Sequence, residues 1–253
     1  MAAILESLGF RLESTDSDRY QVTVPSWRND IHCWEDLSEE VARIYGFDNI
    51  PSTTPRGNIQ MARESDRQVF VDAMKNTFCA LGLNETVSFA FMHPAMFDRL
   101  QVPKDSDLRQ AIAIMNPLTD EYPLVRTTLL PNLLENAMRN FSRKNEDIRL
   151  FEVAPVFFPK GLPVTEEPRE ILKTVGLIAG HRQPMGWSQG KENVDFYDAK
   201  GIIEQLLSAL SIKNYTVEGG HHFALHPGKT AAFKKGRETI AVVGEVHPAV
   251  AAA

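Results

Sequence analysis

The chain has 253 residues, of which 43% are hydrophobic and 24% charged, enough to bury one sizeable core or one core plus a small appendage. Its formal net charge of -6 argues against binding a nucleic-acid backbone by bulk electrostatics, which needs many Lys and Arg residues. No apolar stretch approaches the roughly 20 residues of a membrane span, and the amino terminus lacks the basic region of a secretory signal. Cys33 and Cys79 lie far apart without CxxC spacing, which favours a reduced cytosolic compartment and a role as small apolar residues.

The first 53 residues predict a small α+β domain. The run ILESLGF is helix-like and stops at Gly9 without a capping residue before it, so we expect it to be the end of something larger. A hairpin is expected over 10–24, because FRLES and YQVTV are strand-like runs separated by the turn-rich TDSDR. A helix follows over 36–45 and ends at Gly46, a residue that can adopt the left-handed conformation found at helix ends.

The run NIPSTTPRGN combines two prolines with Ser, Thr and Gly and carries no apolar period, which is typical of a linker. We place the linker over 54–63, between the small domain at 1–53 and a larger domain over 64–253. The larger domain begins with an amphipathic helix over 64–81, which ends at Gly82. Four residues form its expected apolar side: Phe70, Met74, Thr77 and Leu81.

The rest of the larger domain mixes strand-like and helix-like runs. Strands are expected at 85–92, 111–115, 148–158, 174–180, 215–219, 229–235 and 239–246. Helices are expected over 129–144, where Pro131 suits a first turn, and over 198–210. Tight turns such as KKGRE favour an antiparallel sheet with helices on one side of it, and so an α+β architecture. We expect the strands at 111–115, 148–158 and 174–180 to belong to one sheet.

The acidic helix of the small domain separates charged from apolar residues. Asp36, Glu39, Glu40 and Arg43 fall on one side of a helical wheel. The other side is apolar: Leu37, Val41, Ile44 and Tyr45. The Asp30 carboxylate can reach the acidic side, and clustered carboxylates without His or Cys suit magnesium or calcium. Acids in a first helical turn also interact favourably with the helix dipole, and Glu39 can pair with Arg43, so the residues alone favour a structural role over a metal site.

The run VPSWRND followed by EDLSEEVARIYGFDNIP resembles a small domain of the bacterial phenylalanine–tRNA ligase β subunit. In that family, four carboxylates hold a magnesium ion that is shared with the catalytic α subunit. The resemblance places these carboxylates at Asp30, Asp36, Glu39 and Glu40. The run departs from the family at HCW (32–34), which includes none of the four. The resemblance therefore implies a magnesium site that an isolated fragment of β binds weakly or leaves empty.

The resemblance continues through NPLTDEYPLVRTTLLPNLLENAMRNFSRKNEDIRLFEVAPVF, DFYDAKGIIEQLL and HPGKTAAFKKGRETIAVVGEVHPAV, and so covers nearly the whole chain. It implies a class II synthetase-like antiparallel sheet, flanked by helices and catalytically degenerate. Adenylate formation needs cations aimed at the triphosphate. In RLFEV, however, Phe151 stands directly before Glu152 in place of the expected Arg-x-Glu arrangement, and AVVGEVHPAV contains no Arg. No catalytic or cofactor-binding residue is therefore expected.

Two other groups of side chains suggest binding. The stretch RNFSRKNEDIR at 139–149 predicts either a solvated helix end or a contact with RNA or an acidic partner, and it holds four cations: Arg139, Arg143, Lys144 and Arg149. Four histidines gather near the end of the chain: His221, His222, His226 and His247. These histidines could form a zinc site. However, no Cys or HxxxH spacing supports such a site, and two of the histidines precede proline in turn-like contexts.

The combined prediction is a non-catalytic scaffold portion of the β subunit. It supports the α subunit, which attaches L-phenylalanine to its tRNA using ATP. The resemblance further implies a heterotetramer of two α and two β subunits, tRNA in the full assembly, no membrane, and a cytoplasmic location. Two rival readings stay open: an active class II-like ligase domain, and a nucleic-acid-binding module built from the small domain and the basic stretch at 139–149.

Overall fold

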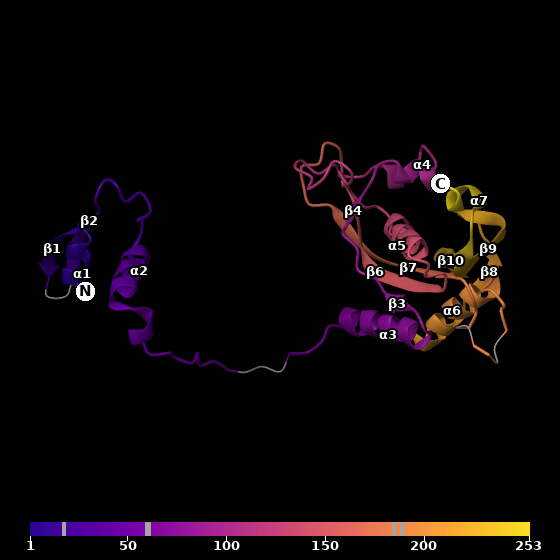
Figure 1. Ribbon diagram of the computed structural model, residues 1–253, viewed down its shortest axis with the longest axis horizontal. Helices are drawn as coiled ribbons and strands as arrows, with labels where there is room; N and C mark the ends of the chain where they lie inside the picture. Colours follow the sequence, from indigo (N-terminus) through magenta and orange to yellow (C-terminus); the bar gives the residue numbers. More distant parts are fainter. Residues whose placement is uncertain (17–18, 59–61, 184–185, 188–189) are drawn as a thin grey trace. The chain divides into compact units, whose positions relative to one another are not determined.

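The computed structural model describes residues 1–16, 19–58, 62–183, 186–187 and 190–253, which fall into two units (Figure 1). We call Met1–Ala62 the small unit and Arg63–Ala253 the large unit. Residues 51–58 form neither helix nor strand. Residues 59–61 of the expected linker, and residues 17–18 in the expected hairpin turn, lie outside the described part of the chain.

The small unit confirms the expected helix, hairpin and helix. Its elements are α1 (Ala2–Ser7), β1 (Arg11–Asp16), β2 (Arg19–Thr23), α2 (Trp34–Tyr45) and a 3₁₀ turn, η1 (Phe47–Asn49). The two strands are antiparallel, with Leu12 opposite Val22. Gly9 joins α1 to β1 at φ +87°, and a Cβ there would lie 3.3 Å from the Trp27 ring, so the junction requires glycine. Leu5, beside this junction, is buried.

The large unit contains helices and short and long strands. In chain order they are α3 (Asp66–Ala80), β3 (Asn84–Glu85), β4 (Phe91–Met92), α4 (Met96–Arg99), η2 (Asp107–Arg109), β5 (Leu124–Val125), α5 (Leu130–Ser142), β6 (Ile148–Phe158), β7 (Arg169–Ala179), α6 (Phe196–Ala209), β8 (Thr216–Gly219), β9 (Leu225–Lys235), β10 (Glu238–Val246) and α7 (Pro248–Ala251). The three long helices and the strands expected at 148–158, 174–180, 215–219, 229–235 and 239–246 are confirmed.

The strands of the large unit form separate sheets. Strands β6 and β7 pair antiparallel along their whole length, from Ile148 opposite Ala179 to Phe158 opposite Arg169, and β3 adds a short parallel edge. A second antiparallel sheet has the order β10-β9-β8, and β4 pairs with β5. The strand at 111–115 was expected in one sheet with β6 and β7, and that prediction is wrong. The side-chain period identifies strands but does not choose their partners.

Helices cover both faces of the β6–β7 pair, so the prediction of helices on one side is also wrong. Helix α5 lies on one side of the pair, and α3 and α6 lie on the other (Figure 1). The reason is visible in β6, where the consecutive residues Phe151 and Glu152 are 0% and 2% exposed. Successive side chains of a strand point to opposite faces, so a strand buried at consecutive positions needs cover on both. On the α3 side, the Phe78 and Phe151 rings stack at 4.8 Å.

Two expected strands do not form as predicted. The run at 85–92 forms only β3 and β4, which belong to different sheets, and Val87 and Phe89 between them are 91% and 81% exposed. Part of its backbone is held by a side chain, because Asn132 Nδ2 donates to Phe89 O and Phe91 O. The run at 111–115 contributes one isolated bridge, between Ala113 and Leu124.

Within the described ranges, no helix is both long enough and apolar enough to span a membrane.

Candidate functional site

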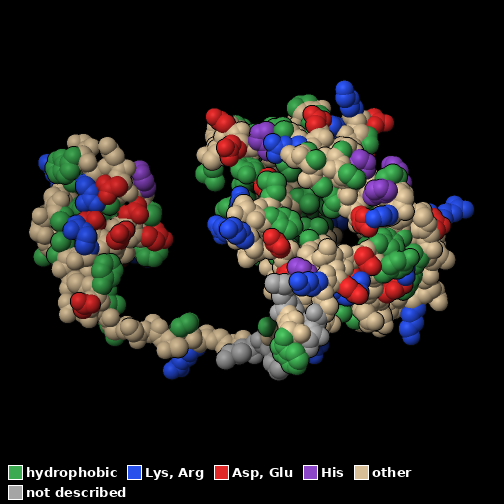
Figure 2. Space-filling view, turned by 45° about the vertical axis from the view of Figure 1, so that its right-hand side comes forward, with side chains coloured by type: hydrophobic (Ala, Val, Ile, Leu, Met, Phe, Trp, Pro, Cys, Tyr) green, Lys and Arg blue, Asp and Glu red, His purple; other side chains and the backbone are tan. Residues whose placement is uncertain are grey.

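The four carboxylates of the predicted magnesium site lie in the small unit, on α2 and the turn before it. Asp36, Glu39 and Glu40 are on α2, and Asp30 lies in the preceding turn. Glu40 is only 7% exposed, although the helical wheel places it on the same side as Asp36 and Glu39. Asp30 and Glu39 are exposed. Acidic and basic side chains therefore share one surface of the small unit, where Figure 2 shows them side by side.

Arg28 joins two of these carboxylates. Its Nε donates to Asp30 Oδ1 at 2.9 Å, and its Nη2 donates to Asp30 Oδ2 at 2.7 Å. The same guanidinium donates through Nη1 to Glu40 Oε2 at 3.1 Å, and Arg43 Nη2 donates to that oxygen at 2.6 Å. Hydrogen bonds from Arg28 lower the pKa of Asp30 to about 2, and hydrogen bonds from Arg28 and Arg43 lower the pKa of Glu40 to about 2. In return, Asp30 and Glu40 raise the pKa of Arg28.

Asp36 is committed to the start of α2. Its Oδ2 accepts hydrogen bonds from the backbone N–H groups of His32, at 2.7 Å, and Cys33, at 3.0 Å. These two bonds lower the pKa of the Asp36 carboxyl. The first N–H groups of a helix and of the residues before it lack partners within the helix, so this carboxylate stabilises the helix start.

The arrangement of these four residues does not fit a magnesium ion as it stands. Their oxygen atoms are the donors that magnesium prefers. In the described parts of the chain, however, no group of three or more His, Cys, Asp or Glu side chains is placed to hold a metal ion. Arg28 already supplies the positive charge between Asp30 and Glu40.

The histidines near the end of the chain serve local turns. In each case Nδ1 accepts a backbone N–H two residues later: His222 from Ala224 at 3.2 Å, His226 from Gly228 at 3.1 Å, and His247 from Ala249 at 3.2 Å. His221 is exposed. The structure brings no zinc-binding cluster together within the residues it describes.

A buried polar cluster in the large unit escaped the sequence reasoning. Arg126 Nη1 donates to Glu152 Oε1 at 2.8 Å, and both side chains are 2% exposed. Arg126 Nε also donates to Pro155 O at 3.1 Å. Glu152 Oε2 and Asn132 Oδ1 are buried without a hydrogen-bond partner among the described residues. A charged residue inside each apolar run, PLVRTTLL and RLFEVAP, was the signal that could have revealed this pair.

The long cleft of the large unit is poor in cations. It has a volume of about 1150 Å³ and runs along β7, α6 and β10. Its described lining contains only two Lys or Arg side chains, Arg169 and Lys173. The Arg169 guanidinium lies 5.8 Å from the centre of the Phe158 ring. The lining is mainly apolar, which suits packing better than the binding of a triphosphate.

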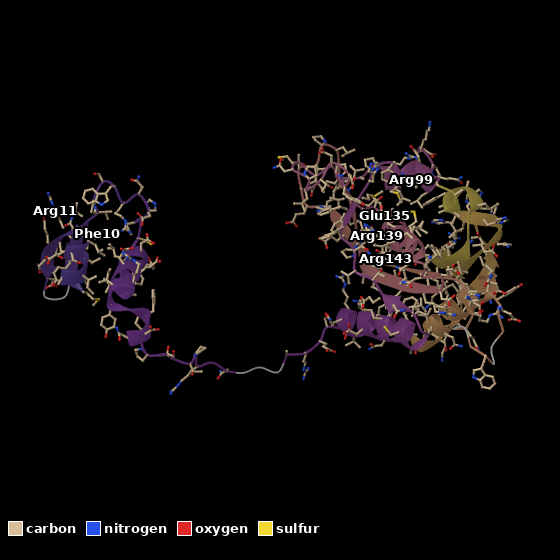
Figure 3. All side chains as sticks on the ribbon, viewed as in Figure 1. Phe10, Arg11, Arg99, Glu135, Arg139 and Arg143 are labelled. Atoms are coloured by element: carbon tan, nitrogen blue, oxygen red, sulfur yellow. The ribbon has the colours of Figure 1, made fainter. Side chains whose placement is uncertain are left out.

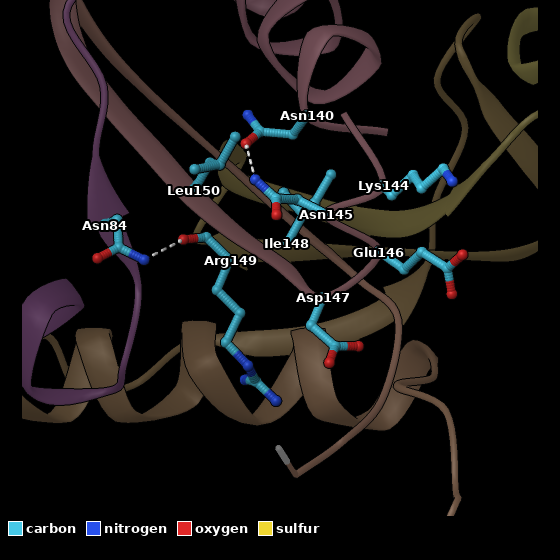
Figure 4. Close-up of a pocket in the computed structure, with 9 residues that line it drawn as sticks. All are labelled: Asn84, Asn140, Lys144, Asn145, Glu146, Asp147, Ile148, Arg149 and Leu150. Atoms are coloured by element: carbon cyan, nitrogen blue, oxygen red, sulfur yellow. Dashed lines mark hydrogen bonds between the residues drawn. The ribbon is translucent and has the colours of Figure 1, made fainter. Parts of the chain in front are cut away.

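A smaller polar pocket of about 310 Å³ lies where α5 passes into β6 (Figure 4). Asn145 Nδ2 donates to Asn140 Oδ1 at 3.2 Å, and Asn84 Nδ2 donates to Arg149 O at 3.3 Å. These asparagine side chains already bind one another or the backbone, and they close the end of α5. The pocket is therefore a structural feature of the connection between α5 and β6.

The basic stretch does not form one continuous surface. Arg139 and Arg143 are exposed and follow Glu135 along α5 (Figure 3). Arg149 turns back into the fold, where its Nη2 donates to Arg182 O at 2.6 Å. Of the predicted basic stretch, Arg139 and Arg143 therefore remain exposed along α5, and the acidic Glu135 lies beside them on the same helix.

An apolar rim of the large unit consists of four highly exposed hydrophobic side chains. We define it by Val87, Phe89, Met115 and Leu118, which are 91%, 81%, 93% and 90% exposed. Their segments are neighbours, because β4 pairs with β5 and Ala113 bridges to Leu124. Exposed apolar side chains of this size seldom lie together on the surface of a monomer, and where they do they are often part of a binding surface.

Comparisons with known proteins match the two units separately. Residues 1–47 match the tRNA synthetase B5 domain, and residues 50–253 match the phenylalanyl tRNA synthetase beta chain CLM domain. Among solved structures, a pyrrolysyl-tRNA synthetase from Desulfitobacterium hafniense is similar over 71% of this chain and 58% of its own, at 14% identity and a TM-score of 0.48.

Several relatives of this chain are named phenylalanine–tRNA ligase beta subunit. The relative from Syntrophotalea carbinolica is 40% identical over 99% of this chain and 32% of its own length. Those from Geobacter sulfurreducens and Moorella thermoacetica are 38% and 37% identical, and each is covered over 31% of its length. The chain thus spans about a third of these relatives. Because a family model matches most of its residues, the chain belongs to the phenylalanyl tRNA synthetase beta chain CLM domain family.

Proposed function

We propose that the chain is a non-catalytic scaffold portion of a phenylalanine–tRNA ligase β subunit. It supports a catalytic α subunit that attaches L-phenylalanine to its tRNA using ATP. The observation that carries the proposal is the apolar rim, whose four side chains are each more than four-fifths exposed on a unit of this family. Exposed apolar side chains grouped in this way are typical of a surface that a partner covers.

The placement of the charged side chains supports the proposed lack of catalysis. Adenylate formation concentrates negative charge, and a protein offsets it with Arg side chains and magnesium. The described lining of the long cleft offers only Arg169 and Lys173. Glu152 stands where the resemblance to class II synthetases expects the Glu of the Arg-x-Glu arrangement. Its side chain is buried in an ion pair with Arg126 and so serves the packing of the fold. This arrangement supports a class II-like fold that keeps its framework without the chemistry.

The partner follows from the family name and the rim. A β subunit implies an α subunit, and we propose an assembly of two α and two β subunits in the cytoplasm that binds tRNA as a whole. The magnesium ion on Asp30, Asp36, Glu39 and Glu40 stays a prediction of the resemblance. No step of this proposal passes through that ion.

The test is copurification of the 253-residue chain with the α subunit of the same organism. We expect retention of α by the parent chain and a loss of about tenfold or more in affinity for Phe89→Asp, because a charge would enter an apolar interface core. Tyr197→Asp is the matched control. Tyr197 is 74% exposed, lies outside the rim, and occupies the first turn of α6, where Asp is tolerated.

Two results would overturn the proposal. Equal retention of α by Phe89→Asp and Tyr197→Asp would remove the rim from the interface. ATP–pyrophosphate exchange with phenylalanine by the purified chain, well above background, would show that the chain is itself an active ligase domain.

A further inference from the structure

Arg28 is fixed at the centre of the acidic group of the small unit. It forms ion pairs with Asp30 at 2.7 Å and with Glu40 at 3.0 Å, and its guanidinium carbon lies 5.8 Å from the centre of the buried Phe10 ring. The side chain is only 21% exposed. Three contacts from three parts of the small unit therefore hold one guanidinium.

We propose that Arg28 is the built-in counter-ion of this acidic group, and that a divalent cation binds Asp30 and Glu40 only after the Arg28 guanidinium has left. All four oxygen atoms of the two carboxylates lie within hydrogen-bonding or ion-pairing distance of Arg28. A magnesium ion about 2.1 Å from the same oxygens would stand beside a fixed positive charge. Guanidinium and metal ion thus compete for one place.

Arg43 does not play the same part. Within the described part of the chain it pairs with Glu40 alone, at 2.6 Å. Its side chain is 52% exposed, and it lies one helical turn along α2 from Glu40. Such an i,i+3 pair on a helix surface is local and weak. Arg28, in contrast, links the turn that carries Asp30 to α2, which makes Arg43 a matched control of equal charge.

The competition predicts how Arg28→Gln changes metal binding. We expect the full chain with Arg28→Gln to bind Mg²⁺ about tenfold or more tightly than the parent, because the removal frees two carboxylates of a competing cation. Arg43→Gln is expected to stay within about twofold of the parent, because Asp30 remains paired. Adding Asp30→Asn to Arg28→Gln should abolish the gain. The measurement is isothermal titration with MgCl₂ at constant ionic strength.

A second measurement needs no variant, so a failure of Arg28→Gln to fold leaves the proposal testable. The Arg28 Nε–H, which is hydrogen bonded to Asp30, is followed by NMR in the parent chain during a MgCl₂ titration. If Mg²⁺ binds and shifts the α2 amide signals, we expect the Arg28 Nε–H signal to be lost over the same range of MgCl₂ concentration. If Mg²⁺ does not displace Arg28, we expect both the Arg28 and the α2 signals to stay unchanged. A shift of the α2 amides while the Arg28 Nε–H stays in place would overturn the proposal. So would an Arg28→Gln chain that folds and binds Mg²⁺ no better than the parent.

Both measurements use the 253-residue chain without a partner, so their outcome is independent of the copurification experiment. The apolar rim can fail as an interface while Arg28 still competes with the metal ion, and the reverse also holds.

Discussion

Arg126 and Glu152, which are 26 residues apart in the chain, form a 2.8 Å ion pair inside the large unit, and each side chain is 2% exposed. Arg126 also donates from its Nη1 to Phe89 O at 3.5 Å, at the base of the segment that carries Val87 and Phe89. The pair therefore ties the long strand β6 to the backbone that presents the apolar rim. This contact connects the interior of the fold with its proposed binding surface.

Removing one member of this pair should strongly destabilise the large unit. We expect Arg126→Met to lower the free energy of unfolding by about 3–5 kcal/mol, because the Glu152 carboxylate would stay buried without its counter-charge. Lys229→Met is the control, since Lys229 and Glu245 pair at the surface, and its cost should stay below about 1 kcal/mol. Urea denaturation measures both variants. Equal losses would show that Arg126 contributes no more than a surface pair.

The aromatic stack between α3 and β6 should dominate the packing of that helix. Phe78 is 2% exposed and Phe70, on the same helix, is 46% exposed. We expect Phe78→Ala to cost about 3–5 kcal/mol through the cavity it leaves, and Phe70→Ala to cost less than about 1 kcal/mol. Thermal or urea unfolding of the two variants decides the matter, and a reversed order would contradict the placement of the core.

His222 should make the large unit less stable in mild acid. Burial and the neighbouring His221 lower the pKa of His222 below its ordinary 6.5, so folding favours the neutral ring. Its contribution is complete above pH 6.5 and is lost as the pH falls below 6.5 toward the folded-state pKa. His222→Asn keeps an acceptor for Ala224 N–H and removes the titration. We expect a smaller fall in unfolding free energy between about pH 7 and about pH 5 for this variant than for the parent. The same fall in both chains would contradict this account.

The exposed arginines of α5 should not give the isolated chain an RNA-binding site. We expect Arg139→Ala with Arg143→Ala to change RNA affinity by less than about twofold, because two cations beside Glu135 release few counterions. A filter-binding titration over a range of salt concentrations measures this, with Lys234→Ala and Lys235→Ala as an equally charged control. A specific loss on changing the two arginines, with a shallower salt dependence, would favour the nucleic-acid-binding module.

Long periodic runs were predicted well because local sequence decides them. Helix α5 begins near Pro131 as expected, and β6 spans the predicted run at 148–158. In both, a continuous apolar pattern and the burial in the folded unit favour the same element. Short runs such as 85–92 failed, because the hydrogen bonds that shape them come from Asn132 and Arg126, about forty residues away in the chain.

The candidate site shows what a helical wheel omits. It grouped Glu40 with Asp36 and Glu39, but Glu40 is buried while Glu39 is exposed. A buried carboxylate needs a partner, and that partner is Arg28, which lies outside the helix and attracted no attention in the sequence. In the same way, the apolar side expected for α3 included Phe70 and missed Phe78, because neighbouring elements decide which side of the helix is covered.

The turn bonds of the histidines fix which nitrogen carries the proton. Because Nδ1 of His222, His226 and His247 receives an amide hydrogen, each neutral ring keeps its own hydrogen on Nε2. A metal ion needs a lone pair on the ring, and here one lone pair is used by the backbone and the other nitrogen has none. Coordination through Nδ1 would therefore require the turn to open, and coordination through Nε2 would require a change of tautomer that also breaks the turn bond.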